Sequence, residues 1–179
     1  MTQRFRITLF FLVPVIVILD QWSKWVIVNE PKFNALGCLD QTQECGQVEV
    51  WPFFDLTMVW NRGISFGIGQ SEGIMRWLLV LMTTAIAIGF SVWLYRVARR
   101  ITGIALTLVI GGAFGNVIDR VRFGAVVDFL DFRGIFHPYF FNYIFNVADA
   151  AISVGAVLLF ADQFLMSRQD KTAGAVNED

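Results

Sequence analysis

The chain has 179 residues, of which 56% are hydrophobic and 16% charged, a composition too apolar for a soluble domain and typical of an integral membrane protein. Its formal net charge of −1, with no basic stripe, excludes a nucleic-acid-binding protein. Two cysteines and one histidine are too few for a zinc or iron–sulfur site, so we expect no metal and no cofactor.

The first apolar segment, residues 7–28, follows a basic start that contains Arg4 and Arg6. It has no small-residue cleavage site, and Asp20 and Lys24 precede its end. We therefore interpret it as a retained transmembrane helix rather than a signal peptide. At about 1.5 Å per residue it is roughly 33 Å long, enough to cross the hydrocarbon core of a bilayer.

Residues 29–73 are less hydrophobic and form the largest segment that can fold outside the bilayer. Within them, residues 48–60 are rich in Val, Phe, Thr and Trp with partial alternation, and Pro52 favours an edge strand or a break. We therefore expect a small extracytoplasmic β-sheet on the membrane surface. Cys38 and Cys45 also lie here, and the sequence is compatible both with a disulfide and with two free thiols.

Three further apolar segments, residues 74–95, 101–118 and 145–166, are long enough to span the bilayer. With the first segment they predict a membrane α-helical fold of four transmembrane helices and a small extracytoplasmic β-sheet, in which all 179 residues belong to a single membrane domain. We expect residues 119–144 to form an extracytoplasmic loop over the site described below. The polar residues 167–179 predict a disordered cytoplasmic tail.

The basic residues predict the orientation of these spans. Lys and Arg are equal in number on the two sides, but those on one side are concentrated in the two tails and the tight hairpin between residues 95 and 101. Short segments of this kind are where the preference of basic residues for the cytoplasm acts most strongly. We therefore place both termini in the cytoplasm, and we expect the cytoplasmic halves of the helices to be free of charged residues.

Polar side chains within and beside the predicted spans gather at one depth. With both termini cytoplasmic, the ends of the first and third spans and the start of the fourth lie near the outer leaflet. The residues that meet there are Asp20, Lys24, Asn61, Arg62, Asn116, Asp119, Asn146 and Asp149. Because buried polar groups are costly in a bilayer, their convergence indicates a functional site at the outer membrane–water boundary.

Two carboxylates of this region, Asp128 and Asp149, are the candidates for chemistry. Two like charges a few ångströms apart resist ionising together, so such a pair can share one proton. One carboxylate can then activate water as a general base while the other, protonated, polarises a peptide carbonyl.

Several motifs follow one another along nearly the whole chain. They are DQWSK at 20–24, WNRG at 60–63, GGAFGNVIDR at 111–120, VVDF at 126–129 and FNVAD at 145–149. Through these motifs the chain resembles the bacterial lipoprotein signal peptidases, the signal peptidase II family. The resemblance implies an aspartyl endopeptidase of the bacterial cytoplasmic (inner) membrane that removes signal peptides from prolipoproteins, cutting before a diacylglyceryl-modified cysteine. It also implies inhibition by the cyclic peptide globomycin.

The same resemblance implies roles for individual residues. Asp128 and Asp149 would be the catalytic pair. Substrate-binding or supporting roles would fall to Asp20, Lys24, Asn61, Gly63, Asn116, Asp119, Arg120, Asn146 and Ala148. Two structural interpretations stay open beside these: an i,i+4 ion pair between Asp20 and Lys24, and a supporting ion-pair network around Asp119 and Arg120. The expected partners are lipidated prolipoproteins and membrane lipid, and nothing in the sequence demands more than a monomer.

Two other classes of protein compete with a peptidase. Intramembrane Asp, Asn and Lys also build ion pathways, so a small proton-coupled transporter is the main alternative. A transporter predicts polar groups at several depths, whereas here they crowd at one end, and no repeat relates the first pair of spans to the second. A non-enzymatic membrane adaptor would leave two facing carboxylates without a role.

Overall fold

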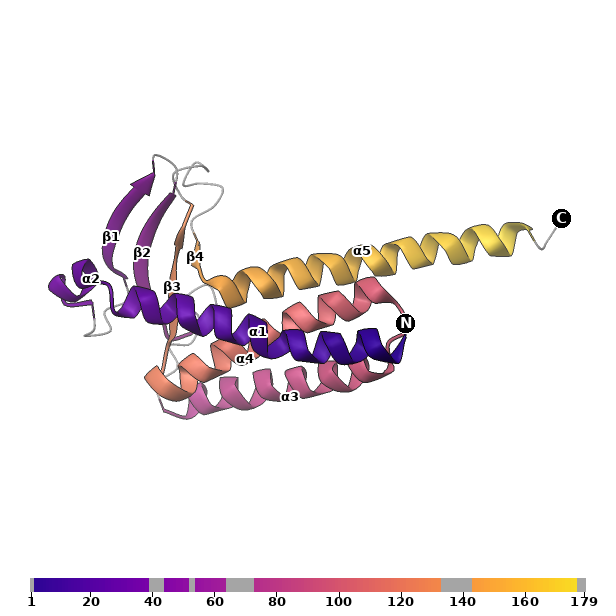
Figure 1. Cartoon of the computed structure of the whole chain (residues 1–179), viewed down its shortest axis with the longest axis horizontal. Helices are drawn as coiled ribbons and strands as arrows, with labels where there is room; N and C mark the ends of the chain where they lie inside the picture. Colours follow the sequence, from indigo (N-terminus) through magenta and orange to yellow (C-terminus); the bar gives the residue numbers. More distant parts are fainter. Residues whose placement is uncertain (1, 39–43, 52–53, 64–72, 133–142, 177–179) are drawn as a thin grey trace.

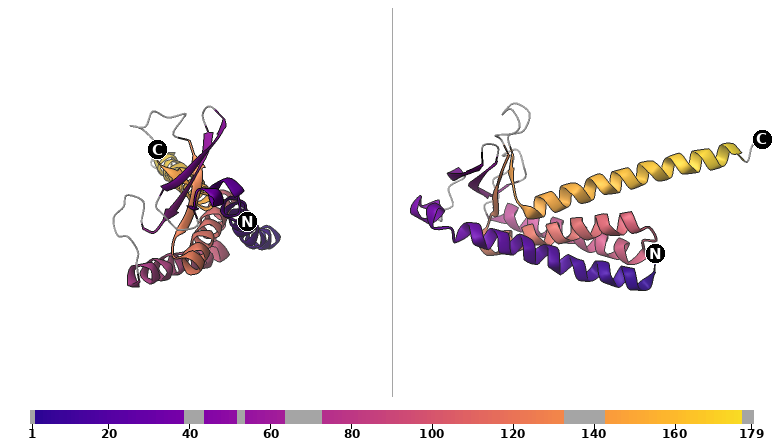
Figure 2. Two further views of the ribbon diagram at one scale, coloured as in Figure 1. Left: turned by 90° about the vertical axis from the view of Figure 1, so that its left-hand side faces the viewer. Right: turned by 45° about the horizontal axis from the view of Figure 1, so that its top comes forward.

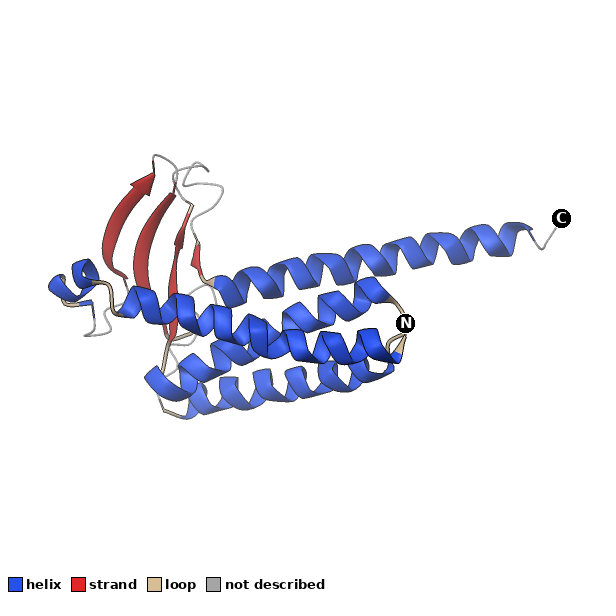
Figure 3. Ribbon diagram, in the orientation of Figure 1, coloured by secondary structure: helices blue, strands red, loops and turns tan. Residues whose placement is uncertain are grey.

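The computed structural model describes residues 2–38, 44–51, 54–63, 73–132 and 143–176. Within them, long helices form a bundle, and an antiparallel β-sheet covers one end of it (Figure 1; Figure 3, sheet in red). Both termini lie toward the other end of the bundle (Figure 1). This arrangement confirms the predicted fold class of membrane-spanning helices with a small sheet.

Four helices of the described chain are long and apolar enough to cross a membrane. They are α1 (Gln3–Val28), α3 (Ile74–Arg96), α4 (Arg100–Phe123) and α5 (Val147–Val176). Helix α4 packs against each of the other three, and α5 extends beyond the bundle (Figure 2). In the most apolar window of α4, 67% of the residues are buried, against 11–17% in the other three helices. Helix α4 is therefore the centre of the bundle, and the others expose apolar side chains to lipid.

Small residues let the other helices approach α4 closely where the site is built. A Cβ at Gly112 would collide with the backbone of Ala148 at the start of α5, and one at Gly115 would collide with the carboxylate of Asp20 on α1. Glycine at these positions removes that obstacle, as small residues do at helix interfaces in membranes. The glycines of α4 thus bring α1 and α5 to the same region of its surface.

Two predicted boundaries are wrong. Helix α4 continues five residues past the predicted end of the third span at 118 and reaches Phe123, so Asp119 and Arg120 are helical rather than part of a loop. Gly124 ends this helix in the left-handed conformation, with φ of 79°. Helix α5 continues to Val176, where the sequence predicted a disordered tail from residue 167. The tail contains Gln, Lys and Ala, which are strong helix formers and can extend a helix that is already nucleated.

The sheet takes strands from two distant parts of the chain. Its order is β1-β2-β3-β4, with every neighbour antiparallel. The strands are β1 (Glu44–Trp51), β2 (Phe54–Asn61), β3 (Val126–Asp131) and β4 (Ile144–Phe145). The sequence analysis placed the whole sheet before residue 74, but β3 and β4 come from the predicted loop 119–144. Because Asp128 is on β3, the sheet itself carries part of the candidate site.

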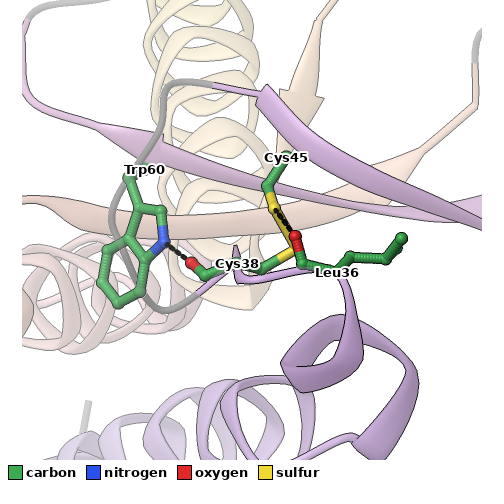
Figure 4. Close-up of a disulfide and its surroundings, with 4 residues drawn as sticks. All are labelled: Leu36, Cys38, Cys45 and Trp60. Atoms are coloured by element: carbon green, nitrogen blue, oxygen red, sulfur yellow. Dashed lines mark hydrogen bonds between the residues drawn. A yellow bond between two sulfur atoms is a disulfide. The ribbon is translucent and has the colours of Figure 1, made fainter.

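A disulfide joins Cys38 to Cys45, with their Cα atoms 5.3 Å apart, which resolves a question that the sequence left open. It ties the segment after the short helix α2 (Pro31–Ala35) to β1. The indole Nε1 of Trp60 on β2 donates a hydrogen bond of 2.7 Å to the Cys38 carbonyl (Figure 4). This contact links the disulfide to the strand that ends at Asn61 in the candidate site.

Candidate active site

The candidate site lies where the sheet meets the bundle. Asp128 on β3 is buried, with 2% of its surface exposed. Its Oδ2 accepts a hydrogen bond of 3.0 Å from Asn61 Nδ2, and its Oδ1 accepts one of 2.6 Å from Asn146 Nδ2. The backbone N–H of Gly63 donates to Asn61 Oδ1 at 3.2 Å, which orients the Asn61 amide with its NH₂ group toward the carboxylate. The two described side chains that donate to Asp128 are thus neutral amides.

The environment of Asp128 favours its protonated form. Burial of the carboxyl, assisted by the nearby charge of Asp149, raises the pKa of Asp128 to about 8 from an ordinary value of 3.8. The hydrogen bonds from Asn61 and Asn146 act in the opposite direction but do not offset the burial. A carboxyl in such a site can hold a proton at neutral pH and donate it to a ligand.

Asp149 lies in the first turn of α5 and is half-buried. Its Oδ1 accepts a hydrogen bond of 2.7 Å from Asn116 Nδ2 on α4, and its Oδ2 accepts one of 3.4 Å from the Asn146 backbone. The Asn146 side-chain oxygen in turn accepts from the Asp149 N–H at 2.8 Å, which makes a reciprocal cap at the start of the helix. Asn146 therefore binds both aspartates and holds them in one site.

A buried ion-pair network of Asp20, Lys24 and Asp119 lies next to the two aspartates. Lys24 Nζ lies 2.8 Å from Asp20 Oδ2 and 2.8 Å from Asp119 Oδ2, and it donates to Asn116 Oδ1 at 3.2 Å. The i,i+4 ion pair on α1 is thus confirmed. The second interpretation is confirmed for Asp119, which belongs to a supporting network in which its ion-pair partner is Lys24 of α1.

The network also fixes the elements that carry the site. Asp20 Oδ1 accepts a hydrogen bond of 2.9 Å from the N–H of Ala148, which ties α1 to the start of α5. Asp119 Oδ2 accepts one of 3.2 Å from the N–H of Val127, which ties α4 to β3 next to Asp128. These carboxylates therefore position the backbone on either side of the catalytic candidates.

Arg120 is a cation near the aspartate pair that forms no ion pair with Asp20 or Asp119 among the described contacts. Its guanidinium lies within electrostatic range of Asp149, Asp128 and Asp119. One nitrogen donates a long hydrogen bond of 3.5 Å to the Asn116 carbonyl, while the buried Nε has no hydrogen-bond partner among the described residues. Arg120 thus has donors available for a ligand bound beside the two carboxylates.

All of the sequence-predicted site residues lie in the described part of the chain, and the structure brings them together. The described residues contain no group of three or more His, Cys, Asp or Glu side chains that could hold a metal ion. Residues 133–142 of the predicted loop 119–144 lie outside the described residues, so the role of that loop as a cover over the site stays a prediction.

Sequence reasoning missed two polar features. Gln21 Nε2 donates to Asp119 Oδ1 at 2.8 Å and to the Gly115 carbonyl at 3.1 Å, which the motif DQWSK could have indicated. The expectation of uncharged cytoplasmic halves is wrong, because Asp162 on α5 is fully buried near the end of the fourth span. It accepts hydrogen bonds from Arg99 Nη2 at 2.6 Å and Nε at 3.0 Å, and from the Thr102 hydroxyl.

Comparisons with known proteins agree with this geometry. A family model described as signal peptidase (SPase) II matches residues 12–165, a range that includes both aspartates and all of their supporting residues. The lipoprotein signal peptidase of Methylobacterium radiotolerans is 47% identical over 126 residues, which cover 69% of this chain and 72% of that protein. The lipoprotein signal peptidase of Sphingopyxis alaskensis is 40% identical over 167 residues, covering 90% of this chain and 87% of that protein. A solved structure described as a bacterial membrane enzyme matches with a TM-score of 0.72 at 28% identity, covering 89% of each chain.

Proposed function

The chain belongs to the signal peptidase II family, and from this premise we propose that it removes signal peptides from prolipoproteins in the bacterial cytoplasmic membrane. We further propose that it cleaves immediately before a cysteine that carries diacylglycerol. The nucleophile is a water molecule activated by Asp128 and Asp149, so the enzyme is an aspartic endopeptidase. Globomycin inhibits it by occupying the space between these two carboxylates.

The observation that carries this mechanism is the bridging position of Asn146. Its side-chain NH₂ group donates to Asp128, and its backbone N–H and side-chain oxygen contact Asp149. One residue thus fixes two carboxylates that lie in different environments, one buried among amides and the other at a helix N-terminus. Carboxylates whose environments differ in this way suit the separate roles of acid and base.

The proposed steps follow from these environments. Asp149 carries a negative charge, which the α5 N-terminus and the nearby Arg120 stabilise, while Asp128 holds a proton. Asp149 accepts a proton from water as the water oxygen bonds to the peptide carbon, and Asp128 donates its proton to the carbonyl oxygen. The C–N bond then breaks as the leaving amine takes the proton from Asp149 and the diol returns one to Asp128.

The depth of the site suits a lipidated substrate. The aspartates lie at the sheet end of the bundle, which we assign to the outer leaflet with both termini in the cytoplasm (Figure 1). A diacylglyceryl group holds its cysteine at the membrane interface, so the scissile bond meets the aspartates without leaving that depth. The monomer contains all of the residues that the proposal uses.

A gel-shift cleavage assay with purified protein in detergent and a diacylglyceryl-modified prolipoprotein tests the proposal. We expect wild-type cleavage that globomycin blocks, and a fall of at least about 10⁴-fold in both Asp128→Asn and Asp149→Asn. Asp55→Asn is the matched control, because Asp55 is an aspartate of the same sheet that contacts Gln47 outside the site. It should cleave at the wild-type rate.

Two outcomes would refute the proposal. Either site variant could keep full activity while remaining folded, which would exclude the aspartate pair as the catalytic groups. Alternatively, the wild type could leave the lipidated substrate uncut and cleave only an unlipidated one, which would exclude the proposed substrate.

Asp162 bears on the transporter alternative, because polar groups now lie at two depths of the bundle. Its carboxylate is, however, occupied by Arg99 and Thr102. Between the two ends, α4 presents buried apolar residues such as Leu106 and Ile110. Proton flux in proteoliposomes that equals the background of empty vesicles would exclude transport, and flux abolished by Asp162→Asn would support it.

A further inference from the structure

A pocket opens at the end of the bundle away from the sheet, between the start of α1 and the end of α3. Its volume is about 480 Å³, and it is lined by Gln3, Arg6, Ile7, Phe10 and Tyr95. One wall is polar and cationic, whereas Ile7 and Phe10 make the wall that continues along α1 toward the bilayer core. None of these residues takes part in the proposed peptidase chemistry.

Arg6 has an unsatisfied donor in this pocket. Its guanidinium carbon lies 5.8 Å from the ring centroid of Tyr95, and its buried Nε has no hydrogen-bond partner among the described residues. Arg99, at the same end of the bundle, differs in being paired with the buried Asp162. A buried N–H without an acceptor is costly, so a ligand that brings an acceptor to Arg6 would be favoured.

The surroundings define the charge of that ligand. Arg96 is exposed at this end, and Arg100 lies 5.3 Å from the ring of Phe5. The local charge is therefore positive, which favours a group with a net negative charge over a zwitterion. The apolar wall next to Arg6 favours a ligand that also carries a hydrocarbon chain.

We propose that this pocket binds an anionic phospholipid of the adjacent leaflet. The phosphate accepts hydrogen bonds from the Arg6 guanidinium, and an acyl chain lies along Ile7 and Phe10. Under the orientation proposed above, this leaflet is the cytoplasmic one. The pocket would then anchor the start of α1 against the end of α3, at the opposite end of the bundle from the aspartates.

Native mass spectrometry of the full chain in neutral detergent tests this proposal by counting bound lipids. The probes are dioleoyl phosphatidylglycerol, which is anionic, and dioleoyl phosphatidylethanolamine, which is zwitterionic. We expect Arg6→Gln to bind phosphatidylglycerol about fivefold more weakly than the wild type and to leave the weaker binding of phosphatidylethanolamine unchanged. Arg4→Gln, the same change two residues away on an exposed side chain that does not line the pocket, should bind both lipids as the wild type does.

Three results would overturn the proposal. Wild-type affinity of Arg6→Gln would remove Arg6 from the site, and equal losses in Arg4→Gln and Arg6→Gln would mean diffuse surface attraction. Equal affinity for the two lipids would exclude recognition of an anion. Arg6→Lys, which keeps the charge, should bind better than Arg6→Gln, and Asp128→Asn should bind lipid as the wild type does, so this test does not depend on the peptidase activity.

Discussion

Two buried carboxylates at opposite ends of the bundle differ in what surrounds them. Asp162 receives two N–H groups of Arg99 and the hydroxyl of Thr102, so its negative charge is matched by a cation in direct contact. Asp128 is also buried, and the hydrogen bonds that it accepts from described side chains come from the neutral amides of Asn61 and Asn146. The first environment pairs the carboxylate directly with a cation, whereas the second lets a proton bind and leave.

The ion-pair network beside the site sharpens this contrast. Lys24 lies between Asp20 and Asp119, where one cation serves two carboxylates. Lys24 is thus paired with these two carboxylates rather than with Asp128 or Asp149, and Arg120 lies near the aspartate pair without a direct ion pair among the described residues. The difference teaches that a buried acid acquires a functional protonation state when its hydrogen bonds come from neutral groups.

The amide side chains at the site should therefore affect turnover more than any single ion pair does. We predict that Asn146→Ala lowers kcat about 100-fold with little change in KM, because the variant loses contacts to both aspartates while the rest of the binding surface remains. Steady-state cleavage of the lipidated substrate measures this effect. Asn34→Ala, the same change on an exposed residue of α2, is the control. A rise in KM alone would show that Asn146 binds substrate rather than positioning the acids.

The protonation of Asp128 should set the alkaline limit of activity. Since the pKa of Asp128 is about 8 and the proposed mechanism needs its proton, kcat should fall as the pH rises through 8, by about tenfold per pH unit above it. Because the two carboxylates form a coupled pair, the profile should be bell-shaped. A plateau that extends to pH 10 would contradict the assignment of the proton to Asp128.

The same pKa predicts how stability depends on pH. The folded value of about 8 lies above the ordinary value of 3.8, so the folded chain binds the extra proton between these two pH values. Its contribution to stability is complete below about pH 4 and is lost as the pH rises through 8. Thermal unfolding of the wild type and Asp128→Asn across this range checks the sign, because the variant should lack this component.

Much of the site could be predicted from the sequence for a physical reason. A polar residue inside an apolar span needs a partner, so Asp20, Lys24, Asn116 and Asp149 had to face one another once the order and direction of the spans were known. Spacing alone placed Lys24 one turn from Asp20 and predicted their ion pair.

The rest depended on contacts between distant parts of the chain. Strand β3 pairs with β2 across more than sixty residues, with Asn61 opposite Val126, and no local pattern specifies that register. The ion-pair partner of Asp119 comes from another helix, so the residues next to Asp119 in the sequence do not identify it. Asp162 was overlooked because it belongs to none of the motifs, and its partners Arg99 and Thr102 come from another part of the chain.

Replacing the carboxylate of Asp162 should affect the stability of the protein rather than its turnover. We predict that Asp162→Asn lowers the free energy of unfolding by about 3 kcal/mol, since Arg99 and Thr102 lose their charged acceptor. The folded variant should cleave substrate at a rate within about twofold of the wild type. Thermal unfolding in detergent and the cleavage assay measure the two effects, and Asp55→Asn is again the control. A large loss of turnover in the folded variant would mean that the two ends are coupled.

Removing the disulfide tests whether this covalent link helps to hold the amide groups that contact Asp128. It closes a short loop from Cys38 to Cys45, so replacing both cysteines by serine should lower the free energy of unfolding by about 2 kcal/mol. Turnover should fall by less than about threefold, because Asn61 stays held by the pairing of β2 with β3 even if the Trp60 contact to Cys38 weakens. Reduced wild-type protein should behave like the double variant in both assays. If turnover instead fell as far as in Asn146→Ala, the orientation of Asn61 toward Asp128 would depend on the disulfide. The disulfide, at the outer edge of the sheet, would then help to maintain the neutral surroundings of Asp128.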